Sequence, residues 1–278
     1  MRIDAHHHLW TYDRQAFGWI DPNAAIAHDY DTDDLTAALA ERQIDAAIAV
    51  QARQTPLETQ ALLAAAADCP GIIAVVGWID LKAPDVAEHI DAERTPRLVG
   101  YRHVVQDEPD AEFLLDADFI RGVRAVAAAG LSYDLLVDHR QLAHVPAFLD
   151  RVGEGQFILD HAAKPSIAAG GWQPWADRLA AAAACPDLYC KVSGLVTEAD
   201  HRNWRADQVE RYLDHVFALF GPDRLIWGSD WPVCLLAAGY GAVYDLVADY
   251  VARHCPDQAA AIFGGNALSA YAIGEVAP

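Results

Sequence analysis

The chain has few cysteines, and none forms a CxxC pair. Its five cysteines are scattered: Cys69, Cys185, Cys190, Cys234 and Cys255. An odd number at irregular spacing argues against a disulfide framework and against a cysteine-based zinc site. We therefore expect reduced, mostly buried thiols in a cytoplasmic protein.

Positive charge and long apolar runs are also scarce. Lysine and arginine number 20 against 40 acidic residues, which gives a formal net charge of −20. Such a surface repels phosphate backbones and anionic lipid, so we expect no nucleic-acid or membrane partner. The first twenty residues lack the pattern of a signal peptide, and no apolar run is long enough to cross a bilayer. The sequence leaves the oligomeric state open.

Short β-branched runs alternate with helical patterns along the chain. The composition is ordinary for a globular protein, with 53% hydrophobic and 22% charged residues. We expect strands at 2–5, 46–50, 72–78, 98–101, 133–137, 157–159, 188–192 and 225–227. Helical periodicity is clear at 33–43, 57–68, 118–130, 207–221, 240–254 and 256–272. This alternation predicts parallel strands joined by helical crossovers.

Eight such units favour a closed (β/α)8 barrel, that is an α/β fold of the TIM-barrel type. A barrel of this type needs about 250 residues, so we expect one domain over 1–278. An open doubly wound sheet is the alternative. Its usual glycine-rich phosphate loop is absent after the first expected strand, where histidines stand instead.

Polar residues follow most of the expected strands. In a barrel these strand ends surround one opening, so their side chains converge on a single cavity. The candidates for substrate binding at these positions are Gln51, Arg53, Trp78, Arg102, His103 and Trp231. Alternation along the strand leaves the direction of His103 open.

His6 and His8 are two residues apart, so both side chains can point into the barrel. Two imidazoles at this spacing suit a divalent metal, together with His161 and Asp230 at other strand ends. Asp230 follows Gly228 and Ser229, which are small enough for close approach of a ligand. Its carboxylate is a candidate general base or metal ligand, and a helix cap is the alternative.

Only three lysines occur, and two of them, Lys164 and Lys191, stand at or near strand ends. Lys191 lies within an apolar run, where an unpaired ammonium is costly. It is a candidate catalytic group, with a buried ion pair as the alternative. Together with Arg53 and Arg102, these cations indicate a ligand that carries negative charge or many oxygens.

Seven motifs resemble those of the amidohydrolase superfamily, in its lactonase branch. They are Asp4-Ala-His6-His-His8-Leu-Trp10, Val50-Gln-Ala-Arg53, Val76-Gly-Trp-Ile-Asp80, Gly100-Tyr-Arg-His103, Leu159-Asp-His-Ala-Ala-Lys-Pro165, Cys190-Lys-Val-Ser-Gly194 and Gly228-Ser-Asp-Trp-Pro232. The likeness extends over effectively the whole chain. The segments at 106–108, 194–200 and 231–238 are most similar to sugar-lactone hydrolases. The resemblance implies a barrel that acts on a small-molecule sugar lactone in carbohydrate metabolism.

The metal ligands depart from the pattern of binuclear relatives. Those enzymes add a lysine or glutamate at the fourth strand and a histidine at the fifth. Here the fourth strand offers Arg102, and the fifth offers no clear histidine. The resemblance therefore implies either no required metal or one divalent ion, with zinc as a candidate, at His6, His8, His161 and Asp230.

The expected reaction is addition of water to a lactone carbonyl, with Asp230 as the base. Arg102, Lys164 or Lys191, the three histidines, or a metal would stabilise the oxyanion. His161 is counted with Asp230, Lys164 and Lys191 among the catalytic candidates. The alternatives are a metal-dependent decarboxylase, another hydrolase of this superfamily, and a barrel that binds a sugar acid without catalysis.

Overall fold

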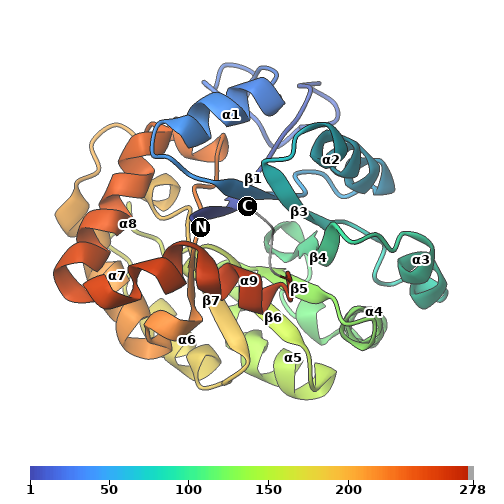
Figure 1. Cartoon of the computed structure of the whole chain (residues 1–278). Coiled ribbons are helices and arrows are strands. Elements are labelled where there is room, and N and C mark those ends of the chain that lie inside the picture. The colour runs from blue at the N-terminus through green and yellow to red at the C-terminus, as the bar shows by residue number, and fades with distance from the viewer. Residues whose placement is uncertain (275–278) are drawn as a thin grey trace.

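The computed structural model describes residues 1–274, and eight strands form its centre (Figure 1). Each strand pairs in parallel with the next along the chain, so the order in the sheet is the order in the sequence. The strands are β1 (Ile3–His7), β2 (Ala46–Val50), β3 (Ile72–Gly77), β4 (Leu98–Val104), β5 (Ser132–Leu136), β6 (Gln156–Leu159), β7 (Leu188–Val192) and β8 (Leu225–Trp227). The predicted (β/α)8 barrel is confirmed. The single domain expected for 1–278 includes residues 275–278, which lie outside the described part.

The first and last strands meet at their carboxyl ends and close the barrel. The amide of Asp230 donates to the carbonyl of His6 at 2.8 Å, and the amide of His8 donates to the carbonyl of Trp231 at 2.7 Å. A parallel bridge joins His7 to Trp231 at the same place. Closure therefore brings the predicted histidine pair next to the predicted carboxylate.

Helices surround the barrel in Figure 1. In the described residues they are α1 (Thr32–Ala40), α2 (Pro56–Asp68), α3 (Val86–Ala92), α4 (Ala117–Ala128), α5 (Val145–Val152), α6 (Trp175–Ala183), α7 (Ala206–Phe220), α8 (Tyr240–His254) and α9 (Asn266–Ala270). In α4, Phe119, Val123 and Val126 recur at helical spacing and are buried. Asp116 caps this helix by accepting hydrogen bonds from the amides of Asp118 and Phe119. Within residues 1–274, no helix has the length and apolar character that crossing a membrane requires.

Five segments differ from the sequence expectation by two residues or more. The strand expected at 2–5 is Ile3–His7, the helix expected at 33–43 is Thr32–Ala40, and the helix expected at 118–130 is Ala117–Ala128. The strand expected at 98–101 continues to Val104, because residues 102–104 pair with 134–136 of β5 although two of them are polar. The helix expected at 256–272 is interrupted and consists of two short turns, Pro256–Gln258 and Ala261–Gly265, followed by α9. The chain leaves helical geometry at Gly264, where a side chain would collide with the carbonyl of Met1 at 2.3 Å.

Apolar side chains fill the amino-terminal end of the barrel interior. Ile48, Ile158 and Ile226 form one cluster with Tyr271, which follows α9. Figure 1 shows α9 lying across this end of the barrel. The opposite end, where the strands finish, is therefore the end that can admit a ligand.

Candidate active site

A cavity of about 470 Å³ opens at the carboxyl-terminal ends of the strands. Ligand pockets in proteins have volumes of about 300–1,000 Å³, so this space suits a small molecule. Its wall combines charged, amide and apolar side chains: His8, Ala16, Trp19, Ala52, Arg53, Gln54, Arg102, Val104, Gln106, Asp107, Leu136, His161, Lys164, Asp230 and Val233.

Asp230 lines this cavity from a turn that follows β8. Its φ is +59°, in the left-handed region that side chains other than glycine seldom adopt. Such a conformation costs about 1–2 kcal/mol, so neighbouring contacts must hold it. Besides the bond to His6, the carbonyl of Asp230 accepts a hydrogen bond from the amide of Cys234 at 2.8 Å. The turn directs the carboxylate toward the histidines.

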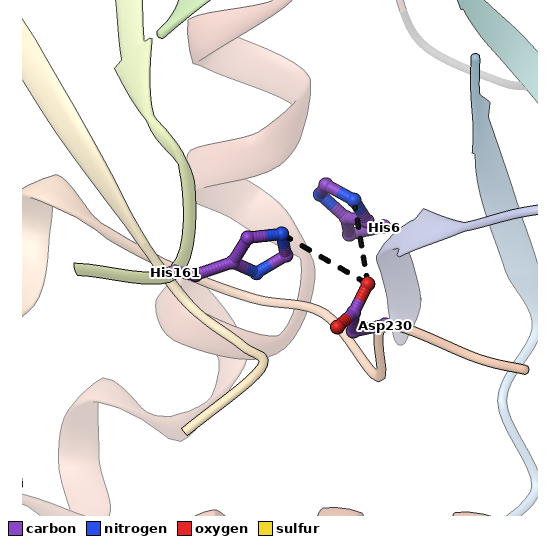
Figure 2. A group of neighbouring side chains, drawn as sticks. All are labelled: His6, His161 and Asp230. Atoms are coloured by element: carbon purple, nitrogen blue, oxygen red, sulfur yellow. Dashed lines mark ion pairs between the residues drawn. The ribbon is translucent and has the colours of Figure 1, made fainter. Parts of the chain in front are cut away.

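Three imidazole rings surround this carboxylate, and we name His6, His8, His161 and Asp230 the carboxylate–imidazole cluster. From Asp230 Oδ1, the Nε2 atom of His8 lies at 3.4 Å, that of His6 at 3.7 Å and that of His161 at 3.9 Å. Figure 2 shows His6 and His161 approaching the carboxylate from two different segments of the chain. The fold therefore brings together all four residues predicted as metal ligands.

The hydrogen bond made by Nδ1 of His8 shows which nitrogen of this ring carries the proton. Nδ1 lies 2.7 Å from the carbonyl oxygen of Val50. A carbonyl oxygen only accepts, so Nδ1 is the protonated nitrogen. In the neutral ring, Nε2 then presents a lone pair toward Asp230, where it can accept a proton or bind a cation.

His161 belongs to a left-handed turn directly after β6. Residues 161–164 have φ values of +52°, +48°, +56° and +49° without any glycine. In this turn Nδ1 of His161 lies 2.8 Å from Ser193 Oγ. Gly194 passes so close that a Cβ there would lie 2.7 Å from the same Nδ1. These contacts fix the ring, and the turn also brings Lys164 to the cavity wall.

His6 lies deeper than His8 and contacts two cations. Arg102 Nη1 lies 3.2 Å from its Nε2, and Lys191 Nζ lies 3.1 Å from its Nδ1. Burial, followed by the charge of Lys191, lowers the pKa of His6 well below its usual value. His6 is therefore a neutral imidazole at physiological pH.

Four buried charged side chains inside the barrel form what we name the barrel ion network: Arg102, Asp134, Asp160 and Lys191. Lys191 Nζ lies 2.6 Å from Asp134 and 3.0 Å from Asp160. Arg102 donates to Asp160 at 3.0 Å and also to the carbonyl of Gln51. Lys191 is 0% exposed and does not line the cavity. Its contacts are those of the buried ion pair that the sequence left as an alternative.

Burial and charge set the protonation of the cluster. Burial alone would raise the pKa of Asp230, but the neighbouring imidazoles of His161, His8 and His6 together lower it well below its usual range. Burial lowers the pKa of His161 to about 4, although Asp230 acts in the opposite direction. At neutral pH the cluster thus holds an ionised carboxylate beside a neutral His161.

The cluster fits one divalent metal ion. One ligand atom each from His6, His161 and Asp230 lie within 4.8 Å of one another (Figure 2). Two imidazoles and a carboxylate form a donor set that zinc accepts. Arg102 already donates toward His6 Nε2, however, so one of the nitrogen lone pairs is partly engaged. The geometry agrees with a single-ion site, but His8, the fourth predicted ligand, is not among the three residues of this group.

Four predicted substrate-binding residues lie outside the cavity wall: Gln51, Trp78, His103 and Trp231. His103 alternates with Arg102 along β4 and therefore faces the helices, where it contacts Glu108 at 2.7 Å. Gln51 donates to the carbonyl of Arg102 at 3.1 Å. The backbone amide of Trp78 donates to Thr59 Oγ1 at 2.8 Å, and the ring of Trp231 packs against Tyr30. Among the predicted substrate-binding residues, Arg53 and Arg102 line the cavity.

Several cavity residues were not predicted as site residues, although the segment 106–108 was noted for its likeness to sugar-lactone hydrolases. Trp19 comes from the loop after β1, and Gln54, Gln106 and Asp107 follow β2 and β4. Gln106 Oε1 is buried and has no hydrogen-bond partner among the described residues. The two glutamines and the aspartate stand within four residues of a strand end, so a longer window after each strand would have included them.

The chain matches known amidohydrolases over nearly its full length. The Amidohydrolase family is matched over residues 3–273. A protein of Burkholderia multivorans named L-fucono-1,5-lactonase is 43% identical, and the alignment covers 100% of this chain and 98% of that protein. A protein of the same name from Burkholderia ambifaria is 37% identical, with coverage of 98% and 96%.

Solved structures agree with this relationship. A crystal structure of an amidohydrolase from Burkholderia multivorans with bound zinc superposes with a TM-score of 0.94 at 43% identity, covering 99% of this chain and 100% of that one. A second crystal form, with bound HEPES, gives 0.93 at 42% identity over 99% and 100% of the two chains. The family match and these full-length relatives show that this chain belongs to the amidohydrolase family.

Proposed function

We propose that this chain is a lactonase that opens a sugar lactone, such as L-fucono-1,5-lactone, to the aldonic acid, with Asp230 as the general base. The observation that carries the proposal is the carboxylate of Asp230, which lies 3.4–3.9 Å from three imidazoles and faces a cavity of small-molecule size. The two relatives named L-fucono-1,5-lactonase support the choice of substrate.

Water attack begins at Asp230. The carboxylate takes one proton from water while the water oxygen bonds to the lactone carbonyl carbon. The resulting oxyanion collapses and breaks the bond to the ring oxygen. Asp230 returns its proton to that oxygen, which becomes the hydroxyl of the open-chain acid. The product acid then ionises to an aldonate.

Lys164 and His161 are the donors in reach of the developing oxyanion. Lys164 lines the cavity and is only loosely paired, with Nζ 3.8 Å from Glu198. When Ser193 donates its hydroxyl proton to Nδ1 of His161, Nε2 of that ring carries the proton that faces the cavity. Donors aimed at a forming oxyanion are among the strongest contributors to ester hydrolysis.

Arg53 and the amides of Gln54 and Gln106 are placed to bind the hydroxyls of the sugar. Arg53 Nε donates to Glu58 at 2.7 Å, which leaves its terminal nitrogens free for a ligand. In this proposal Lys191 makes no contact with substrate, because Asp134 and Asp160 hold its ammonium.

A metal ion is compatible with this site but is not part of the proposed steps. His6, His161 and Asp230 would hold it, and when bound it supplies a Lewis acid that polarises a carbonyl oxygen.

The location of this protein in the cytoplasm stays a prediction.

A pH-indicator screen of aldonolactones, with and without chelator, tests the proposal. We expect acid release well above the spontaneous rate from L-fucono-1,5-lactone or a close analogue, and a loss of roughly 10²–10⁴-fold in the Asp230→Asn protein. Thermal stabilisation by a sugar acid without turnover of any lactone would instead indicate a binding protein. Activity that releases carbon dioxide and disappears with chelator would indicate a decarboxylase.

A further inference from the structure

We propose that Asp4, at the start of β1, is a positioning residue that sets the orientation of Asp230 by holding the turn after β8 through Ser229. This inference rests on the proposed function, because it concerns the same carboxylate. Asp4 and Ser229 are both 0% exposed, and neither lines the cavity.

Asp4 accepts four hydrogen bonds from three parts of the chain. Its Oδ1 accepts from the amides of Ser229 at 2.8 Å and His6 at 3.2 Å. Its Oδ2 accepts from the hydroxyl of Ser229 at 2.6 Å and from Tyr240 Oη at 3.1 Å. One buried carboxylate therefore ties β1 to the turn after β8 and to α8.

Ser229 passes this restraint along the turn. Its hydroxyl donates to Asp4 and accepts from the amide of Trp231 at 2.9 Å. The amide of Asp230 is bonded to the carbonyl of His6. All three backbone amides from 229 to 231 thus have partners, and Asp4 binds two of the three directly or through the Ser229 hydroxyl.

The turn needs such support because β8 cannot supply it. β8 ends at Trp227 and has only three residues. Asp230 is held at a positive φ that a free chain would leave. Gly228 permits the close approach that the network requires, since a Cβ there would lie 2.6 Å from the Cβ of His6.

Asp4 acts through Asp230 and not on substrate. It is absent from the cavity wall, and donors within the chain already occupy both of its oxygens. A network that served only to close the barrel would have the same contacts. The two roles differ in their effect on turnover by a protein that remains folded, so the test compares kcat with KM and with stability.

The experiment uses three substitutions of decreasing severity: Asp4→Asn, Ser229→Ala and Tyr240→Phe. Asp4→Asn places an NH₂ group among donors, Ser229→Ala removes two side-chain bonds, and Tyr240→Phe removes the outermost bond. Because a displacement of about 1 Å in a catalytic group can cost about 10²-fold, we expect kcat for the lactone to fall about 10- to 100-fold in Asp4→Asn and less in the others, with KM nearly unchanged.

Two matched controls separate positioning from general stability. Ser132 is a buried serine whose hydroxyl donates to the carbonyl of Val99 at 3.0 Å, and it does not line the cavity. Tyr250 lies on the same helix as Tyr240 and donates to Asp214 at 2.7 Å. Ser132→Ala and Tyr250→Phe should lower the melting temperature without lowering kcat. Equal losses of kcat in controls and test variants, or unchanged kcat in folded Asp4→Asn and Ser229→Ala, would overturn the proposal.

A crystal structure of Ser229→Ala gives a readout that does not need the proposed reaction. We expect Asp230 to leave its positive φ, or its Oδ1 to move away from the 3.4 Å contact with His8. An unmoved Asp230 would contradict the role of Asp4 even if the wild-type chain opens a lactone. A displaced Asp230 in a chain that opens no lactone would support the role and remove the proposed function.

Discussion

Two groups of buried charges lie next to each other in this barrel, and their packing differs. In the barrel ion network, the carboxylates of Asp134 and Asp160 lie 2.6–3.0 Å from Lys191 and Arg102. In the carboxylate–imidazole cluster, the imidazole nitrogens lie 3.4–3.9 Å from Asp230, beyond a good hydrogen bond. His8, His161 and Asp230 of the cluster line the cavity, whereas in the network Arg102 lines it and Asp134, Asp160 and Lys191 do not.

This difference indicates which buried charges are available for chemistry. The network pairs its charges at close range inside the barrel, as a structural ion pair does. Asp230 keeps its charge but is only loosely bonded, and a water or a ligand can complete its contacts. A buried charge is therefore a candidate for catalysis when its bonding is incomplete and faces a cavity, and burial alone does not distinguish the two cases.

Replacing Asp230 with asparagine should give the largest effect on activity. The amide keeps the shape of the side chain but cannot take a proton from water. Loss of a general base costs roughly 10²–10⁴-fold, so kcat for the lactone should fall by that range while the protein stays folded. Asp245→Asn, which loses a surface pair with Arg42, is the matched control. Near-normal turnover by a folded Asp230→Asn protein would remove Asp230 from the mechanism.

Replacing Lys191 with methionine should affect stability above all. Methionine fills similar space but leaves Asp134 and Asp160 without their shared counter-ion. Breaking a buried ion pair costs about 3–5 kcal/mol, which urea unfolding would measure. Lys82 pairs with Asp116 on the surface, so Lys82→Met should cost only about 0–1 kcal/mol. If Lys191→Met unfolds normally and loses only turnover, Lys191 acts on the reaction and the contrast between the two groups fails.

Lys164 and Lys191 also show what the sequence could and could not predict. Apolar spacing predicted the barrel, and position after a strand predicted that Arg53, Lys164 and Asp230 would share one cavity. The partners of Lys191 are 57 and 31 residues away, on β5 and after β6. Such partners depend on the register of the closed barrel, which periodicity does not give.

The sequence also did not predict reliably which way a side chain at a strand end points. Arg102 and His103 are adjacent, and β4 is longer than expected, so alternation sends one inward and the other toward the helices. Continuing the strand by three residues would have removed His103 from the site. The left-handed turn at 161–164 contains no glycine, so the sequence gives no signal of it. The placement of His161 beside Asp230 was therefore known only from the structure.

Gly194→Ala should disturb the cluster without touching its residues. A Cβ would lie 2.7 Å from His161 Nδ1 and 3.2 Å from Asp230 Oδ2, so the ring or the carboxylate must move. We expect kcat/KM to fall about 10- to 100-fold, as for other small displacements of catalytic groups. Gly221 has a similar φ of +67° and open space at its Cβ. Gly221→Ala should lose stability from backbone strain and keep its kcat/KM, and an equal kinetic loss there would contradict the steric argument.

The pH dependence should be shallow across the neutral range. Burial lowers the pKa of His161 to about 4, and Asp230 stays ionised at still lower pH. Turnover should therefore be level from about pH 5 to 7, because neither His161 nor Asp230 changes its protonation in that range. An acid limb near pH 6.5, the usual value for histidine, would show that a normally titrating histidine controls the reaction.

The lowered pKa of His161 also makes the free energy of unfolding depend on pH. An unfolded histidine binds a proton below about pH 6.5, whereas the folded His161 binds one only near 4. Between these values the unfolded chain holds more protons, so the contribution of His161 to stability is complete above about pH 6.5 and falls as the pH drops toward 4. Urea unfolding of wild type and His161→Gln across this range would measure it, and equal slopes for both would contradict the shift.

Removing divalent metal should have the smallest effect. His6, His161 and Asp230 fit a zinc ion, but Arg102 donates toward Nε2 of His6 and Lys191 lies beside its Nδ1. Fixed positive charge next to a site opposes cation binding, and Lys164 supplies a donor for the oxyanion without a metal, so turnover after thorough chelation should stay within about two-fold. Metal content and kcat should be measured on the same samples, since a bound zinc alone does not show a requirement.

If kcat instead falls in proportion to metal content and returns with added zinc or manganese, the ion is catalytic. Lys164 would then bind substrate only, and the cluster would differ from the barrel ion network in its ability to hold a metal ion.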